Sequence, residues 1–115
     1  MGNTGGGRDT WKRPEMGAIA EQYCEQIILT NEDPYDEDPL KIVTQMKDGM
    51  SDTAPVEIIM DRRIAIKTAI EKAPDGAYIL VSGKGTDPFI MGPDGTKQVW
   101  SDAQVVKEVL IEVLG

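Results

Sequence analysis

Three short apolar runs that alternate with helical patterns constrain the fold of this 115-residue chain most strongly. The apolar runs have the length and composition of buried strands and cover residues 26–30, 56–60 and 77–82. Helices are predicted for residues 13–25, 39–50, 61–73 and 101–114, with a hairpin at 89–100. Strands that alternate with helices form a mostly parallel sheet, and right-handed crossovers place helices on both faces. The pattern predicts one α/β domain over residues 1–115, with three layers and a central strand at 77–82.

Local signals support three of the helix starts. Asp38 before Pro39 is typical of a capping residue followed by proline at the first helical position. Asp61 is predicted to cap the third helix, and Ser101 with Gln104 matches a capping box before the last helix. The apolar stripe of the first helix is predicted to comprise Met16, Ile19, Ala20 and Tyr23.

Composition excludes several classes of function. The formal net charge of −8 opposes non-specific binding to nucleic acid, whose phosphates attract Lys and Arg. The chain has no histidine, which removes histidine-dependent nucleophilic catalysis and imidazole-based zinc sites. One cysteine permits no intrachain disulfide, and no apolar run approaches the roughly 20 residues of a membrane helix. We therefore expect a cytoplasmic protein that binds neither nucleic acid nor membrane.

Three loops are predicted to meet at one edge of the sheet. They are the glycine-rich residues 1–10, the acidic loop 31–38 that follows the first apolar run, and the loop 83–88 that follows the third. Proteins of this architecture bind ligands outside the carboxyl ends of their strands. The topology therefore predicts a ligand site formed by these loops.

The acidic loop admits three interpretations. Its carboxylates are Glu32, Asp33, Asp36, Glu37 and Asp38. They could bind Ca²⁺ or Mg²⁺, but the spacing does not match a calcium loop and we predict no metal site. The last three precede a helix, where carboxylates stabilise the positive end of its dipole. The first two lie nearer the strand end, where a carboxylate can bind an amine.

The other two loops carry basic residues. The glycines around Lys84 allow close approach of a ligand, or they form an ordinary turn. Arg8, Lys12 and Arg13 form the basic cluster of an acidic chain and could bind a carboxylate or phosphate. The alternative for these three is a solvated terminus. Lys12 and Lys84 are thus candidate anion-binding residues.

Three motifs in order resemble the C-terminal domain of Mur ligases, and most closely the ligases that add the third stem-peptide residue in peptidoglycan synthesis. The family patterns are G-G-x-R-D-x-x-K-R-P-x-M-G, D-N-P-R-x-x-D-P and G-K-G-H-E. This chain has GGGRDTWKRPEMG at 5–17, EDPYDEDP at 32–39 and GKGTD at 83–87. The resemblance covers almost the whole chain and implies a Rossmann-like fold.

The resemblance also implies a chemistry. In the full ligases, ATP with Mg²⁺ phosphorylates the carboxylate of UDP-N-acetylmuramoyl-dipeptide, and the amine of an amino acid attacks the acyl phosphate. By motif position, Arg8 would bind the α-carboxylate of the incoming amino acid. Glu32 and Asp33 occupy the positions of the loop's Asp and Asn. Gly83 and Asp87 occupy the positions of the glycine and glutamate that hold the distal amine.

Two departures from the family pattern bear on specificity. Tyr35 replaces the arginine that pairs with the second carboxylate of diaminopimelate. Without that guanidinium, a distal carboxylate would meet several acids, so a lysine-like diamino acid fits better. Thr86 replaces the histidine of the third motif. The substrate-binding set predicted from the sequence is therefore Arg8, Glu32, Asp33, Tyr35, Gly83 and Asp87.

The resemblance further implies that large parts of the ligase are absent from this sequence. The ATPase domain, the uridine-nucleotide domain and the strand before the glycine-rich start have no counterpart here. We expect a fragment, a split gene product or a truncated form that has no catalytic residue and no cofactor of its own and that could bind the missing domains. A binding module that keeps the fold without catalysis is the alternative. A signalling receiver domain is disfavoured by the glycine-rich start.

Overall fold

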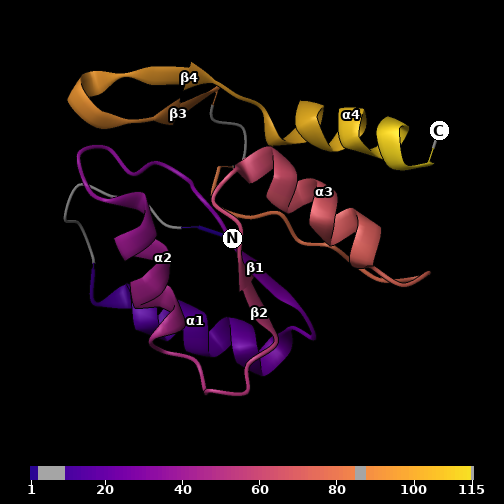
Figure 1. Cartoon of the computed structure of the whole chain (residues 1–115), viewed down its shortest axis with the longest axis horizontal. Coiled ribbons are helices and arrows are strands. Elements are labelled where there is room, and N and C mark those ends of the chain that lie inside the picture. The colour runs from indigo at the N-terminus through magenta and orange to yellow at the C-terminus, as the bar shows by residue number, and fades with distance from the viewer. Residues whose placement is uncertain (3–9, 85–87, 115) are drawn as a thin grey trace.

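The computed structural model describes residues 1–2, 10–84 and 88–114 and forms a mixed α/β fold (Figure 1). Strands β1 and β2 pair in parallel, and β3 and β4 form an antiparallel hairpin. The elements in chain order are α1 (Lys12–Tyr23), β1 (Ile27–Leu29), α2 (Pro39–Lys47), β2 (Val56–Ile58), α3 (Arg62–Lys72), β3 (Phe89–Met91), the 3₁₀ turn η1 (Pro93–Gly95), β4 (Lys97–Val99) and α4 (Asp102–Leu114).

The helices form two pairs around the parallel strands. In Figure 1, α1 and α2 lie together on one side of β1 and β2, and α3 and α4 lie on the other. The first pair packs on β1 through a buried cluster of Ala20, Ile27, Leu29, Val43 and Met46. The second pair packs with the hairpin through a cluster of Ile66, Ile90, Trp100, Val105 and Val109. The fold therefore has two small cores, and α3 of the second also contacts β1.

The predicted helix starts are confirmed. The Asp38 carboxylate accepts a hydrogen bond from the Leu40 amide at 3.0 Å, and Asp61 accepts one from the Ile64 amide at 3.0 Å. The hydroxyl of Ser101 accepts a hydrogen bond from the amide three residues on, at 3.2 Å. These side chains satisfy amide groups that have no partner within the first turn of a helix.

The predicted three-layer fold, with a central strand at 77–82, is not formed. The described residues contain two parallel strands, and the run 77–82 is not a strand. Tyr78 and Leu80 in this run are fully and largely exposed, at 102% and 84%. A buried parallel strand needs a hydrogen-bonded neighbour, and this run pairs with no strand among the described residues.

The apolar stripe predicted for α1 is also partly wrong. Ile19 and Tyr23 are exposed, whereas Gly17 is buried together with Ala20. A Cβ at Gly17 would lie 1.9 Å from the Met46 carbonyl oxygen. The close approach of α1 to α2 thus selects a glycine for the buried face, whereas Met16 of the predicted stripe packs against the core as expected.

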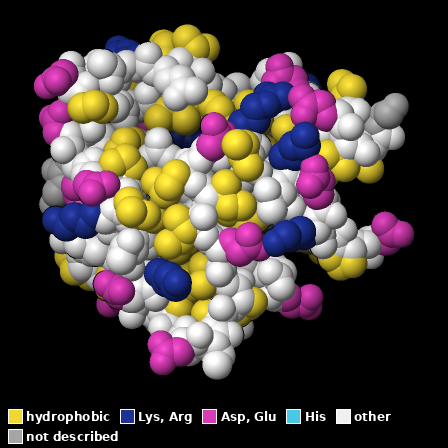
Figure 2. Space-filling model, viewed as in Figure 1, with side chains coloured by type: hydrophobic (Ala, Val, Ile, Leu, Met, Phe, Trp, Pro, Cys, Tyr) yellow, Lys and Arg dark blue, Asp and Glu magenta, His cyan; other side chains and the backbone are white. Residues whose placement is uncertain are grey.

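The surface carries exposed apolar side chains as well as charges. Figure 2 shows hydrophobic side chains across the middle of one face, with charged side chains around them. Within the described residues, no helix has both the length and the apolar character needed to cross a membrane.

Candidate functional site

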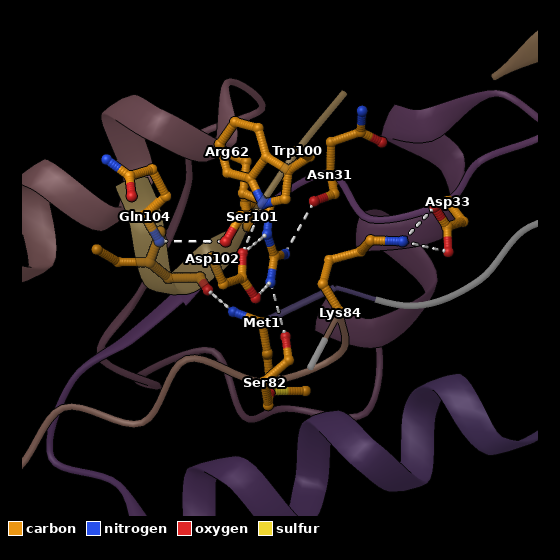
Figure 3. A network of polar contacts seen from close by, with 12 residues as sticks. Met1, Asn31, Asp33, Arg62, Ser82, Lys84, Trp100, Ser101, Asp102 and Gln104 are labelled. Atoms are coloured by element: carbon orange, nitrogen blue, oxygen red, sulfur yellow. Dashed lines mark hydrogen bonds and ion pairs between the residues drawn. The ribbon is translucent and has the colours of Figure 1, made fainter. Parts of the chain in front are cut away.

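The ends of β1 and of the run 77–82 meet through a buried ion pair (Figure 3). The Lys84 ammonium lies 2.8 Å from both carboxylate oxygens of Asp33, although 51 residues separate them. Both residues are buried, and the Met91 amide also donates to Asp33 at 2.8 Å. Asp33 therefore connects the acidic loop, the loop at 83–84 and the hairpin at one point.

Glu32 lies directly against Gly83. The Glu32 residue is 7% exposed, and a Cβ placed on Gly83 would lie 2.9 Å from its carboxylate carbon. Gly83 has φ of +110°, which side-chain-bearing residues rarely adopt. A Cβ on Gly2 would likewise lie 3.0 Å from the Glu32 Cβ. Glycines from two of the three predicted loops thus allow the backbone to approach Glu32.

Arg62 joins the end of β1 to the end of the run 77–82 (Figure 3). Its guanidinium donates to the Asn31 and Ser82 carbonyl oxygens, each at 3.0 Å. These carbonyls belong to the residues immediately before Glu32 and Gly83. Two further hydrogen bonds of 2.9 Å run from Arg62 to the carboxylate of Asp102 at the start of α4. Arg62 therefore fixes the spacing of the loops that carry the candidate site.

The charge of Asp102 is stabilised inside the protein. Burial alone would raise the pKa of its carboxyl, but hydrogen bonds from Arg62 and from the Trp100 indole hold that pKa below its ordinary value of 3.8. The indole nitrogen donates to the carboxylate at 2.7 Å. Asp102 is thus an anion that Arg62 and Trp100 stabilise by hydrogen bonds. It keeps the Arg62 guanidinium oriented toward the ends of β1 and of the run 77–82.

Tyr35 marks the point where the acidic loop contacts the hairpin. Its backbone is in the left-handed region, with φ of 52°, and its amide donates to the Met91 carbonyl at 3.2 Å. The Tyr35 side chain is 37% exposed. Asp36 accepts a hydrogen bond from the Asp94 amide at 2.8 Å. The hairpin is therefore a fourth wall of the site, which the sequence analysis did not include.

Comparison with known proteins identifies the family. The family model described as "Mur ligase, glutamate ligase domain" matches residues 2–85. The chain belongs to the Mur ligase family. It is 48% identical over 106 residues to the UDP-N-acetylmuramoyl-L-alanyl-D-glutamate–2,6-diaminopimelate ligase of Aquifex aeolicus, and 39% identical over 113 residues to that of Cytophaga hutchinsonii. These alignments cover 92% and 96% of this chain, but 22% and 23% of the relatives.

A solved structure agrees with this assignment to the Mur ligases. A protein titled as a structure of the same kind of ligase superposes with a TM-score of 0.89 at 32% identity. The superposition covers all of this chain and 23% of the solved one. The chain therefore has the fold of one part of a Mur ligase and spans between a fifth and a quarter of these relatives.

The structure brings only some of the predicted site residues of this Mur ligase domain together. Glu32, Asp33, Gly83 and Lys84 converge, and Tyr35 of the acidic loop contacts the hairpin beside them. Arg8, Thr86 and Asp87 lie outside the described residues. Lys12 is exposed, with its ammonium 5.4 Å from the centre of the Trp11 ring. Lys84 is committed to Asp33, so its charge neutralises a buried carboxylate here.

The other acids of the loop have separate structural roles. Glu37 binds the buried Arg13 of α1 at 2.5 and 3.1 Å, and Arg13 also donates to Gln45 of α2 at 2.6 Å. Asp38 makes the helix cap that was predicted for it. Within the described ranges, no group of three or more acidic or cysteine side chains could hold a metal ion.

Arg62, Trp100 and Asp102 were not among the site residues predicted from the sequence. A weak signal was present, since Asp102 follows a capping serine and Arg62 follows a capping aspartate. The capping signals account for Asp61 and Ser101, which precede these two residues. They do not indicate that the starts of α3 and α4 face each other. That contact joins residues 40 positions apart and depends on the packing of α3 on α4.

Proposed function

We propose that this chain is the amino-acid-binding part of an ATP-dependent ligase that adds a diamino acid to UDP-N-acetylmuramoyl-dipeptide in peptidoglycan synthesis. The observation that carries this proposal is the convergence of the acidic loop and the loop at 83–84 at the strand ends. Membership of the Mur ligase family and the printed names of the relatives support it. Because the chain spans 22% of the Aquifex aeolicus ligase, the activity of the whole enzyme is part of the proposal.

Glu32 is the residue best placed to receive an amine. Its carboxylate is buried against Gly83 at the end of β1, and a buried carboxylate attracts an ammonium group more strongly than an exposed one does. Asp33 and Lys84 neutralise each other beside it and hold the two loops in register. Arg62 acts as a positioning residue because it binds the carbonyls that precede Glu32 and Gly83.

The buried cations at and near this site are already paired with carboxylates, which does not favour a triphosphate there. A phosphate site needs free cations or a row of backbone amides. Lys84 is paired with Asp33, and Arg13 with Glu37. The proposal therefore assigns ATP and Mg²⁺, and the activation of the muramyl carboxylate, to other parts of the ligase.

Two observations bear on the identity of the amino acid. The relatives reported above carry diaminopimelate in their names at up to 48% identity, and this favours diaminopimelate as the substrate. Tyr35 favours lysine, because a phenol at this position offers no guanidinium for a second carboxylate. We take diaminopimelate as the first candidate and lysine as the second.

A titration of the folded chain tests this site. Backbone amide shifts are followed while diaminopimelate, lysine or ornithine is added. Shifts confined to residues 32–35 and 83–84 are expected, and they should be lost in Glu32→Gln. An equal response to glycine, or shifts spread over the surface, would contradict the proposed diamino-acid site.

A chimera tests the ligase activity and the residue at position 35. This chain replaces the aligned region of the Aquifex aeolicus ligase, and ADP formation is measured with each amino acid. Tyr35→Arg is expected to raise the preference for diaminopimelate over lysine by about tenfold to a hundredfold, since one charge-assisted pair contributes about 1.5–3 kcal/mol. An unchanged preference would show that position 35 does not face the second carboxylate.

The same chimera separates this proposal from a binding module without catalysis. A chimera that folds, binds the diamino acid and turns over ATP only when that amino acid is present supports the ligase. One that folds and binds but never turns over supports the module. The isolated chain is expected to form no peptide bond with ATP, and detectable ligation by it would contradict the assignment of ATP to other parts.

A further inference from the structure

The hairpin of β3 and β4 presents the outer edge of β3 to the acidic loop. The Gly92 amide donates to the Thr96 carbonyl at 2.9 Å. The Trp100 amide donates to the Pro88 carbonyl, also at 2.9 Å. These bonds face β4, and bonded residues alternate along an antiparallel strand, so the peptide groups of Met91 point away from β4. The loop between β1 and α2 lies on that side of the hairpin (Figure 1).

The amide and the carbonyl of Met91 both bind the acidic loop. The amide donates to the Asp33 carboxylate at 2.8 Å, and the carbonyl accepts from the Tyr35 amide at 3.2 Å. At the turn of the hairpin, the Asp94 amide donates to the Asp36 carboxylate at 2.8 Å. The hairpin therefore holds residues 33, 35 and 36 with its own main-chain groups.

The part of the loop that the hairpin holds contains a strained residue. Two of the described residues that are not glycine have positive φ, namely Tyr35 at 52° and Asp94 at 54°. They lie in the two turns that contact each other. The Pro34 carbonyl accepts from the Glu37 amide at 3.0 Å, so Tyr35 is the first central residue of a β-turn. Glycine, asparagine and aspartate are usual at a turn position with positive φ, and a bulky residue there is an outlier.

A strained backbone of this kind persists only where the surrounding contacts impose it. The Glu37 side chain is bound by Arg13 of α1 at 2.5 and 3.1 Å, which fixes the far end of the turn. The bond to the Met91 carbonyl reaches the strained residue itself. Because the backbone angles of a residue set the direction of its Cα–Cβ bond, the hairpin sets the direction in which the Tyr35 side chain leaves the chain.

We propose that the hairpin is the specificity element of the diamino-acid site. Met91 and Asp94 act as positioning residues, because they hold the turn that directs Tyr35 toward the distal group of the substrate. The inference rests on the proposed function, since it needs a diamino acid bound beside Glu32. It also extends beyond the matched family model, which ends at residue 85, whereas β3 begins at Phe89.

Two matched pairs of variants remove one bond each. Met91→Pro deletes the amide that binds Asp33, whereas Met91→Ala keeps it. Proline is tolerated at a strand position whose N–H lies outside the ladder. Asp36→Ala deletes the acceptor of the Asp94 amide, whereas Asp36→Asn keeps a side-chain oxygen and removes only the charge. Circular dichroism checks the fold of all four variants, and if the proline variant unfolds, the pair at position 36 decides.

Hydrogen exchange without any ligand tests whether the hairpin holds the turn. The Tyr35 amide should exchange about threefold to tenfold faster in Met91→Pro and Asp36→Ala than in Met91→Ala and Asp36→Asn. This range corresponds to the net contribution of one hydrogen bond. Equal exchange within both pairs would overturn the inference.

Titrations of the 115-residue chain with diaminopimelate and with lysine, followed by backbone amide shifts, test specificity. The ratio of the two Kd values should differ from one in the wild type and in both controls. It should move toward one by about threefold or more in Met91→Pro and Asp36→Ala. A purely structural role would weaken both ligands alike and leave the ratio unchanged.

The outcomes separate this inference from the proposed function. A wild-type ratio of one, or a ratio that stays the same in all variants, would overturn the role of the hairpin and leave the diamino-acid site standing. If neither amino acid binds the wild type, the proposed function fails, and the specificity role fails with it whatever the exchange rates are.

Discussion

Replacing Arg62 by methionine tests the idea that one buried guanidinium holds the candidate site together. Arg62 is 4% exposed, and its four hydrogen bonds reach the Asp102 carboxylate and two backbone carbonyls. Methionine fills much of the same space without donors. Within the part of the chain that the structure describes, the change would leave the buried Asp102 carboxylate with the Trp100 indole as its one remaining side-chain hydrogen-bond donor.

The expected cost follows from the buried charge. Removing one partner of a buried ion pair costs about 3–5 kcal/mol, because the other charge stays in a poorly solvated place. That is a large share of the about 5–15 kcal/mol by which a domain is stable. Arg63→Met is the control at the next position. Arg63 pairs with Glu108 and Glu112 at 2.8 Å, but its side chain is 39% exposed, so a cost below about 1 kcal/mol is expected.

Urea unfolding followed by circular dichroism gives both free energies of unfolding. The double variant Arg62→Met with Asp102→Leu should cost less than the sum of the single changes by about 1–3 kcal/mol, because it removes both charges. If Arg62→Met costs no more than Arg63→Met, or if the two changes at the pair are additive, the guanidinium does not stabilise the strand ends as argued.

Two further predictions concern single groups near the site. Asp102 has a lowered pKa in the folded state, so its contribution to stability is complete above about pH 4 and is lost as the pH falls below 3.8. The free energy of unfolding should therefore fall more steeply between pH 4 and 2 in the wild type than in Asp102→Asn. Parallel curves for the two proteins would contradict this. In urea unfolding, Gly83→Ala should lower the free energy of unfolding by about 1 kcal/mol or more beyond the loss caused by Gly76→Ala. Both glycines have positive φ, but only at Gly83 would the new methyl meet the Glu32 carboxylate. Equal losses would show that Glu32 moves aside freely.

Local chemistry made much of the fold predictable from the sequence. The caps at Asp38, Asp61 and Ser101 depend on residues within four positions of each other, and each forms as expected. The hairpin at 89–100 follows from a turn sequence between two apolar stretches. Such features need no knowledge of distant parts of the chain.

The site was predictable only in its outline. Parallel topology indicates that loops after different strands meet, and Asp33 does meet Lys84. The sequence pattern did not indicate that these two residues would neutralise each other. It also did not indicate that Arg62 would bind the carbonyls at the ends of β1 and of the run 77–82. Contacts of this kind are set by the packing of helices on the sheet, which the spacing of apolar residues describes only coarsely.

The failure of the prediction for residues 77–82 has a different cause. The apolar composition of this run is that of a central strand. The structure nevertheless leaves its side chains exposed. Strand formation depends on the neighbour as much as on the sequence, because each peptide group of a strand needs a partner. Residues of β1 and of the run 77–82 line the same cavity without forming a ladder. No strand among the described residues pairs with the run 77–82, so a sequence with the composition of a strand stays outside the sheet.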